Sequence, residues 1–553
     1  MKKFLSVAMC AVMLLTAIPF AFAGYTGKTY YVDSSVTDSG NDGLSPENAF
    51  ASVESLQNLT LNPGDSILFK AGGIFNCENL TLTCSGTKEL PIVISTYGEG
   101  ERPLLTTINK ADILRLYDCS YVTVSNLEIT APNGGGIWID TYTKESEGIT
   151  IDNIKFHDIQ NTIATSRDNL TYGPSYARAC VVVKGLPANS RYAVNDLTIT
   201  NCEMYDCGNG ISVWGSWNDE QQPWCDEEDI DPVFNEGVYI SDCYFHDMDA
   251  EALIIGMCDG AICENCRCID CCQNDGINDD GTTFCNAAMW FWGSVNSKIR
   301  YCEIAGQKTL TDGMTCDFDS YTHYCTYEYI YSHDNVHFVA NCPQHSGHKG
   351  NTIRYCLSVN DNLKSNNLSQ YCYDSNEYGL KFYNNTIINP GETIIEGVRE
   401  GYICDNIFYG DFTASFRSGR KKVNDETNEK FVDKFTGTIK NNCFFGTCIP
   451  SCAEDNYICD PGFVGTDFTN PDSFKLKKGS KLIGKGITVL NEKSKDIYGN
   501  EISGSANIGC YAGSGEENSE KQNIFITIWK YLSSILGKAY QWIVDCNNLY
   551  WLF

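Results

Sequence analysis

The sequence of 553 residues has little positive charge. Lys and Arg total 40 against 70 Asp and Glu, which gives a formal net charge of −30. Such a surface repels nucleic-acid phosphates, so we expect no nucleic-acid partner. Intrinsic disorder is excluded for a different reason: 12% of the residues are aromatic, and a chain with this much apolar surface buries it.

Several familiar signatures are missing. No convincing helical period appears between residues 110 and 450, so a helical domain is not expected there. The chain has no G-x-S-x-G elbow, no P-loop and no dinucleotide-binding fingerprint, and therefore no motif for the enzymes that use them. Cys342, His345 and His348 have zinc-like spacing, but no second dense cluster completes the site, so no metal site is predicted.

The N-terminus predicts export. Lys2 and Lys3 precede an apolar run over 4–20, and Ala21-Phe22-Ala23 has the form of a cleavage site. These features are typical of a signal peptide, residues 1–23. We therefore expect a protein that is secreted or held at the cell surface.

A short pattern recurs through the middle of the chain. Asn, Asp or Tyr is followed by Cys or an aliphatic residue, then any residue, then usually an apolar one. Copies begin at Asn126, Asn153, Asn201, Asp242, Asn265, Tyr301, Tyr329, Tyr355, Asn384, Asp405 and Asn441. Short β-rich runs lie between them. Short strands at a repeated spacing without helices predict a parallel β-solenoid, with coils stacked about 4.8 Å apart.

Stacking makes equivalent residues meet. Five copies carry cysteine at the second position of the pattern: Cys202, Cys243, Cys266, Cys302 and Cys356. We predict a small apolar ladder of thiols. Disulfides are the alternative, because secreted proteins usually oxidise their cysteines, but the side chains would have to leave the stack to pair.

The two ends of the chain carry further motifs. The N-terminal ones include Tyr30-Tyr-Val-Asp33 and Pro63-Gly-Asp65, and the C-terminal ones include Asp460-Pro-Gly-Phe463 and Asp496-Ile-Tyr-Gly-Asn500. In these motifs the chain resembles secreted right-handed parallel β-helix proteins of the pectate-lyase-like superfamily, over about residues 28–513. This superfamily contains lyases, glycoside hydrolases, esterases, epimerases and non-catalytic adhesins, so the resemblance indicates the fold and leaves the reaction open.

The predicted fold is therefore all-β: a single-stranded right-handed parallel β-helix. Its expected parts are an N-terminal cap with the first coils (24–110), the β-helix (111–450), closing coils (451–513) and a polar linker (514–523). In the segment 524–553, apolar residues such as Ile528 and Leu532 recur at helical spacing. This predicts an amphipathic helical tail that docks on the solenoid or lies on a membrane surface.

Candidate catalytic residues lie in the run from Asp312 to Asp319. Alternation along a strand turns Met314, Cys316 and Phe318 inward. Asp317 and Asp319 then point outward, with Asp312 at the entrance of the strand. Two residues along a strand span about 6.6 Å, which suits the carboxyl pair of an inverting glycosidase. The alternative is a solvated acidic face.

Tryptophans on the same predicted flank suggest a sugar-binding surface. Alignment of Phe291 with Phe318 turns two indoles outward one coil from the aspartates, and two more lie outward on earlier coils. The predicted substrate-binding tryptophans are Trp290, Trp292, Trp214 and Trp138. The alternative is burial beneath an inserted loop, and residues 216–236 look like such a loop.

Histidines and loop acids complete the candidates. His333 could orient or protonate a substrate hydroxyl, and His337 could bind substrate. A His-Asp pair also occurs at His246 and His157, however, which favours a structural role in a turn. Loop acids such as Glu251 could bind calcium or do nothing, so calcium is a possible cofactor and the main prediction has none.

Three functions follow as hypotheses. The first is a glycoside hydrolase acting on a plant-type polysaccharide or its oligosaccharides. The second is a calcium-dependent pectate-type lyase, whose base is usually Lys or Arg; Lys298 and Arg300 are available but are expected in turns. The third is a non-catalytic surface or adhesive β-helix. In each case we expect a carbohydrate partner and a monomeric protein.

Overall fold

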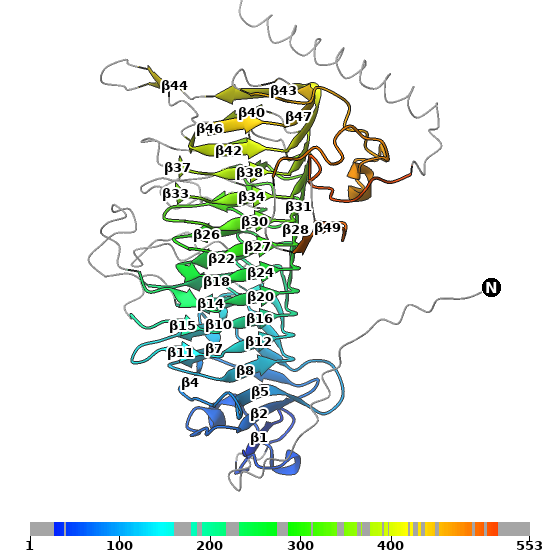
Figure 1. The fold of residues 1–553 in the computed structure, drawn as a ribbon. Coiled ribbons are helices and arrows are strands. Elements are labelled where there is room, and N and C mark those ends of the chain that lie inside the picture. The colour runs from blue at the N-terminus through cyan, green and yellow to red at the C-terminus, as the bar shows by residue number, and fades with distance from the viewer. Residues whose placement is uncertain are drawn as a thin grey trace, which may run out of the picture.

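The computed structural model describes residues 27–37, 40–159, 179–184, 191–216, 232–273, 286–310, 313–339, 348–361, 366–367, 377–389, 392–395, 398–418, 421–423, 430–432, 437–447, 449, 453–488, 493–502 and 506–517. The predicted signal peptide and helical tail lie outside them. The described chain winds into a tall column of stacked parallel strands (Figure 1). The predicted class, a parallel β-helix, is confirmed.

Three long parallel sheets form the walls of the column, and the coils from β7 to β32 contribute one strand to each sheet in turn. The first sheet contains β1 (Thr29–Val32), β2 (Ser66–Lys70), β5 (Ile92–Tyr97), β8 (Val122–Ser125), β12 (Thr150–Asp152), β16 (Thr198–Thr200), β20 (Tyr239–Ser241), β24 (Ile262–Glu264), β27 (Lys298–Arg300), β30 (Thr326–Glu328), β34 (Thr352–Arg354), β38 (Lys381–Tyr383), β42 (Gly401–Cys404) and β46 (Gly437–Lys440).

The second sheet contains β3 (Ile74–Asn76), β6 (Leu104–Thr106), β9 (Glu128–Ala131), β13 (Lys155–Ile159), β17 (Glu203–Tyr205), β21 (Tyr244–His246), β25 (Arg267–Ile269), β28 (Glu303–Ala305), β31 (Tyr331–His333), β35 (Leu357–Val359), β39 (Thr386–Ile388), β43 (Ile407–Ser418) and β47 (Cys443–Thr447), with β40 (Glu392–Ile395) and β36 (Asn366–Asn367) joined through β43. The third sheet contains β4 (Leu80–Leu82), β7 (Asp112–Tyr117), β10 (Gly135–Asp140), β14 (Val181–Val183), β18 (Ile211–Trp214), β22 (Leu253–Gly256), β26 (Met289–Trp292), β29 (Met314–Phe318) and β32 (His337–Val339).

Short elements complete the described structure. They are the strands β11 (Ser146–Glu147), β15 (Val194–Asn195), β19 (Asn235–Glu236), β23 (Cys258–Asp259), β33 (His348–Lys349), β37 (Glu377–Tyr378), β41 (Val398–Arg399), β44 (Lys421–Val423), β45 (Lys430–Val432), β48 (Ser494–Lys495) and β49 (Glu501–Ile502), and the 3-10 helices η1 (Pro46–Asn48), η2 (Val53–Leu56) and η5 (Pro471–Phe474). Within the residues described, none of the helices has the length and apolar character needed to cross a membrane.

The repeated sequence pattern marks one turn of every coil. All eleven first residues of the pattern have a positive φ between 52° and 59°, and each follows a strand of the first sheet. Asn and Asp tolerate this left-handed conformation because their short side chains hydrogen-bond locally. Asn153, for example, donates from Nδ2 to Oδ1 of Asn126 on the previous coil at 2.7 Å. Tyr301 and Tyr329 occupy the same position and stack at 4.7 Å.

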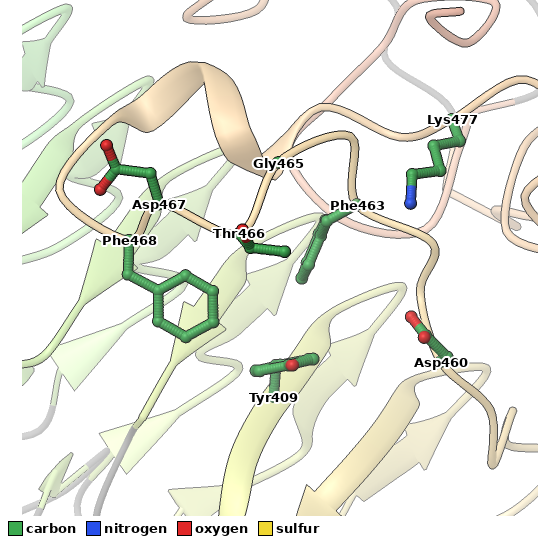
Figure 2. Close-up of a pocket in the computed structure, with 8 residues that line it drawn as sticks. All are labelled: Tyr409, Asp460, Phe463, Gly465, Thr466, Asp467, Phe468 and Lys477. Carbon is green, nitrogen blue, oxygen red and sulfur yellow. The ribbon is translucent and has the colours of Figure 1, made fainter. Parts of the chain in front are cut away.

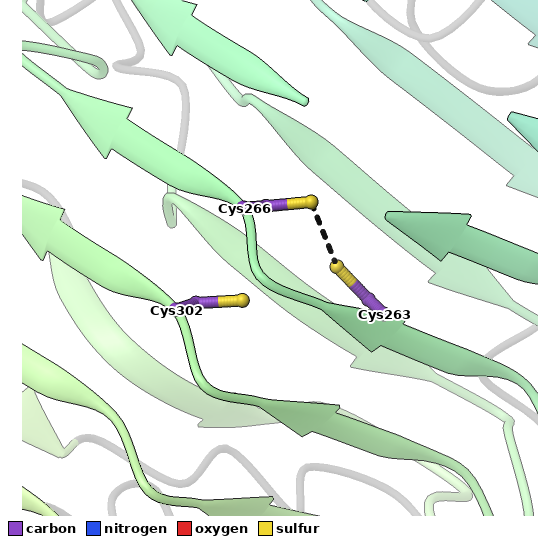
Figure 3. A group of neighbouring side chains, drawn as sticks. All are labelled: Cys263, Cys266 and Cys302. Carbon is purple, nitrogen blue, oxygen red and sulfur yellow. Dashed lines mark hydrogen bonds between the residues drawn. The ribbon is translucent and has the colours of Figure 1, made fainter. Parts of the chain in front are cut away.

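The second position of the pattern points into the core. All five cysteines of the predicted ladder are buried and free, and every other cysteine in the described ranges is also a free thiol. The ladder is joined by Cys263, whose Sγ lies 3.8 Å from that of Cys266, with Cys302 beside them (Figure 3). The thiol of Cys302 donates to the carbonyl of Arg300 at 3.2 Å. The predicted thiol ladder is therefore confirmed.

The chain after β47 covers the outside of the column. The predicted closing coils (451–513) continue the stacking only as far as Tyr457, which bridges Cys443 in parallel. Beyond it, Phe463 and Leu476 pack against the outward side of the second sheet, including Ile407. The segment lies beside the column (Figure 1). It leaves the solenoid because these outward residues are apolar and need cover.

Candidate active site

The strand that carries the aspartates has the predicted register. Asp317 on β29 pairs with Trp290 on β26, and Phe318 pairs with Phe291. The N–H of Asp319 donates to the carbonyl of Phe291 at 2.9 Å, which extends the same register by one residue. The alignment through the two phenylalanines is confirmed, and both aspartates lie on the outer side of the third sheet.

The alternation along β29 is broken near its start. Phe318 and Cys316 pack in the main core as predicted, whereas Met314 belongs to an aromatic cluster on the outer side. The predicted inward position of Met314 is wrong. The reason is that Thr315 also faces inward, where its Oγ1 lies 2.7 Å from Oγ of Ser332. Two successive inward residues shift the pattern by one position.

The tryptophans next to the aspartates are outward but not exposed. Trp214, Trp290 and Trp292 are 3%, 6% and 5% exposed. The ring of Trp214 lies 6.3 Å from that of Trp290 and 5.6 Å from that of Trp292. The three indoles pack with Ile254, Met257, Ala287, Met314 and Tyr321. Their predicted exposure is therefore wrong, and the alternative of burial is the one observed; their role in substrate binding stays a prediction.

Gly256 makes this packing possible. It separates Trp214 from Trp292 in the stack of strands. A Cβ atom at this glycine would lie 2.3 Å from Cε3 of Trp214. Only a residue without a side chain lets the Trp214 indole lie across the intervening strand and reach the next indole.

The two aspartates differ in their surroundings. Asp317 is 5% exposed, and its backbone is anchored from the interior by Tyr327, whose hydroxyl donates to the Asp317 carbonyl at 2.9 Å. Asp319 is half-buried, and its Oδ1 accepts the N–H of Ser320 at 2.6 Å. Asp319 therefore has the more accessible carboxylate. The third predicted carboxylate, Asp312, lies outside the described residues.

The two histidines lie on different sheets. His337 pairs with Met314 and faces the same outer side of the third sheet as the aspartates. His333 belongs to the second sheet, where its Nδ1 lies 3.0 Å from Asp334 and its Nε2 lies 3.4 Å from Glu303. Asp334 has a φ of 57°. The aspartates that follow His157 and His246 in the matching turns also have a positive φ. These contacts are those of the structural turn, and His333 does not share a sheet with the aspartate pair.

A polar network lies inside the column and contacts the inner side of β29. Asp361 is fully buried and accepts hydrogen bonds from Ser332 at 2.7 Å, Ser358 at 2.6 Å and the N–H of Asn335 at 2.9 Å. Asn335 donates in turn to Oγ1 of Thr315 at 3.1 Å. The network holds the irregular start of β29 in place. Its serines occupy an inward strand position that is otherwise apolar in the stack of coils. Nothing in the residue spacing distinguished Asp361 from an ordinary loop acid.

The network predicts a pH effect on stability. Burial raises the pKa of Asp361 from 3.8 to about 6, although its hydrogen bonds to Ser332, Ser358 and Asn335 favour the charged form. Between these values the folded chain keeps a proton that the unfolded chain releases, so stability falls as pH rises through this window. At 1.36 kcal/mol per pKa unit, the loss is about 3 kcal/mol.

Denaturant midpoints of the wild type and of Asp361→Asn, measured between pH 4 and 7, test this effect. The gap between the two proteins should shift in favour of the variant as pH rises to 6 and stay constant above it. Parallel midpoint curves would contradict a protonated Asp361.

A second group of aromatic residues lies at the N-terminal end of the same outer side. Trp138 pairs with Arg115, and Asp140 pairs with Tyr117. The ring of Tyr117 lies 5.1 Å from that of Tyr142, which is half exposed. Five strand-to-strand steps separate Trp138 from Asp317, through β14, β18, β22 and β26, or about 24 Å at 4.8 Å each. Trp138 is therefore not a neighbour of the aspartates.

A buried lysine was missed in the sequence. Lys184 follows β14 on the same outer side and is fully buried. Burial lowers its pKa to about 8, against the opposing effect of Asp140. Lys184 follows Val183, and Val183 pairs with Val213, the residue before Trp214. From the sequence, only this register could have placed Lys184 opposite Trp214 on the outer side.

The fold and the outward aspartates define a parallel β-helix with a candidate active site on its third sheet. No family model matches the sequence. Against curated proteins, the chain is 24% identical over 597 aligned residues to a lacto-N-biosidase of Bifidobacterium longum subsp. longum, covering 88% of this chain and 36% of that protein. The chain thus spans about a third of the length of this relative.

A solved structure of TM-score 0.50 shares the fold. The chain is similar to the crystal structure of a GH136 lacto-N-biosidase from Eubacterium ramulus, with a TM-score of 0.50 and 20% identity over 68% of this chain and 67% of that one. A pectate lyase, Pel9A, matches over 88% of this chain and 96% of its own, with a TM-score of 0.37 and 14% identity. The likeness to the Eubacterium ramulus structure supports the parallel β-helix fold.

Proposed function

We propose that this protein is a secreted glycoside hydrolase in which Asp319 acts with Asp317 or Asp312. The observation that carries the proposal is the position of Asp317 on β29 and of Asp319 directly after it, where the N–H of Asp319 continues the register with β26. Their spacing of about 6.6 Å along the strand suits one carboxylic acid that protonates the leaving oxygen and one carboxylate that activates water on the opposite face of the sugar.

The substrate we propose is an oligosaccharide that carries lacto-N-biose. The name of the Bifidobacterium longum relative, which aligns with 88% of this chain, supports this choice. A plant-type polysaccharide is the alternative substrate. The outward Trp138, with Tyr117 and Tyr142 beside it, is proposed as a distal surface for the rest of a long glycan, because aromatic side chains combine a large apolar face with a polar edge.

A polysaccharide lyase fits less well. Such an enzyme takes a proton with a base that is usually Lys or Arg. Lys298 and Arg300 lie on β27 of the first sheet rather than in turns, and Arg300 is 2.7 Å from Glu264 in an ion pair. They are on a different wall from Asp319 and are held by acids.

One experiment separates these functions. The purified protein is incubated with the p-nitrophenyl glycoside of lacto-N-biose, with neutral glycans and with pectin. Nitrophenol or new reducing ends without unsaturated products are expected. Unsaturated products from pectin would instead establish the lyase, and binding without any product would favour an adhesive β-helix.

The proposed hydrolysis needs no cofactor, because two carboxyl groups and water suffice for the reaction. A chelator such as EDTA should therefore leave the rate unchanged, and a loss restored by calcium would contradict this. We also propose that the protein is monomeric and exported. Size-exclusion chromatography and detection in the culture medium test these two points.

A further inference from the structure

A cavity of about 540 Å³ lies far from the aspartates, between the second sheet and the C-terminal segment that covers it. One wall comes from β43 and the others from residues 460–477 (Figure 2). The aspartates lie at the third sheet, on and directly after β29. The next second-sheet strand in the chain is β31, and β43 lies three strand steps beyond it in that sheet. The volume falls in the range of small-molecule sites.

Three aromatic rings form the apolar side of this cavity. The ring of Tyr409 lies 5.6 Å from that of Phe463 and 5.8 Å from that of Phe468. Both phenylalanines also pack against the buried Phe474, at 5.5 Å and 5.4 Å. The rings are thus held in place before any ligand arrives, which limits the entropy lost on binding.

Charged groups form the other side. Oδ1 of Asp460 accepts the N–H of Gly462 at 2.7 Å, and this local turn orients its carboxylate. The carboxylate of Asp467, whose Oδ1 accepts the N–H of Thr469 at 3.0 Å, points away from this space beside Phe468 (Figure 2). Lys477 comes from the other limb of the segment, and its ammonium group and the Asp460 carboxylate face the same space (Figure 2). Neither Lys477 nor Asp460 takes part in the ion pairs found among the described residues.

We propose that this cavity is a non-catalytic binding site for a neutral sugar unit. The rings offer a surface for the C–H face of a pyranose, while the Asp460 carboxylate can accept from its hydroxyl groups and the Lys477 ammonium group can donate to them. The formal net charge of −30 disfavours the binding of anionic sugars. The inference does not depend on the hydrolytic activity proposed above.

The test is calorimetric titration of the full-length protein with galactose, N-acetylglucosamine and lacto-N-biose, with galacturonate as the anionic comparison. It uses Asp319→Asn, so that no sugar is consumed and the third-sheet site is chemically silent. Binding of at least one neutral sugar is expected. Phe468→Ala and Lys477→Met should each weaken it about tenfold or more.

Two controls keep the result interpretable. Circular dichroism and the denaturant midpoint verify that both variants fold, and Lys477→Met serves if Phe468→Ala does not. Asp242→Asn, at an exposed turn position, should leave this binding unchanged. The proposal is overturned if no neutral sugar binds, if neither cavity substitution weakens binding or lowers its stoichiometry, or if galacturonate binds more tightly than galactose. Hydrolysis is measured separately on the wild type, so failure of one proposal leaves the other testable.

Discussion

Asp319→Asn is expected to lower kcat for glycoside hydrolysis by a factor of about 100 to 10,000, the range for loss of one acid–base group. Asp319, directly after β29, is half-buried, whereas Asp317 on the strand is almost fully buried. The amide of the variant can still accept the N–H of Ser320, so the fold should persist. Initial rates with a chromogenic glycoside and the denaturant midpoint measure the two effects.

A matched control is available in a turn of the same solenoid. Asp242→Asn makes the same chemical change at an exposed position with a φ of 54°, where the neighbouring coils carry Asn201 and Asn265. It should leave both rate and stability unchanged. Asp317→Asn and Asp312→Asn complete the series.

The pattern of losses across this series identifies the pair. Loss in Asp319→Asn and in one other variant assigns the acid and the base to those two positions. Retained activity in all three variants would show that this strand does not carry the chemistry. A matched loss of stability and rate in Asp317→Asn would instead indicate a structural role, since Asp317 is the more buried group.

The sequence predicted what depends on the stacking of coils. The residue that begins each copy of the pattern has to tolerate a left-handed turn, and Asn and Asp do so at most copies. The inward phenylalanines Phe291 and Phe318 stack in the core at 6.1 Å, so aligning them gave the register of the aspartates. Both inferences use contacts between equivalent positions, which repeat from coil to coil.

What the sequence did not predict depends on contacts that do not repeat. Thr315 turns inward because its hydroxyl joins a buried hydrogen-bond network. The network runs through Ser332 to Asp361, which lies much later in the sequence. The C-terminal segment leaves the column because apolar residues such as Ile407 line the outside of the second sheet. Alternation along a strand predicts which side of the sheet a residue faces. Whether that side is buried depends on segments that are distant in the sequence and pack over it.

The tryptophans illustrate the same limit and give the second large effect. Trp214→Ala is expected to lower the free energy of unfolding by about 3–5 kcal/mol, the usual loss for a buried Trp. The indole fills the space over Gly256 and packs on Trp290 and Trp292. Its Nε1 also donates to Oγ of Ser212 at 2.8 Å.

Trp138→Ala is the matched comparison, because Trp138 lies on the same outer side but is only half-buried. It should cost little stability and should raise KM for long oligosaccharides more than for a short chromogenic glycoside. Denaturant midpoints and KM measured for both variants separate the two roles. If Trp214→Ala keeps its midpoint and raises KM, the cluster is a substrate platform rather than packing, since an indole that holds the fold together cannot be removed without loss of stability.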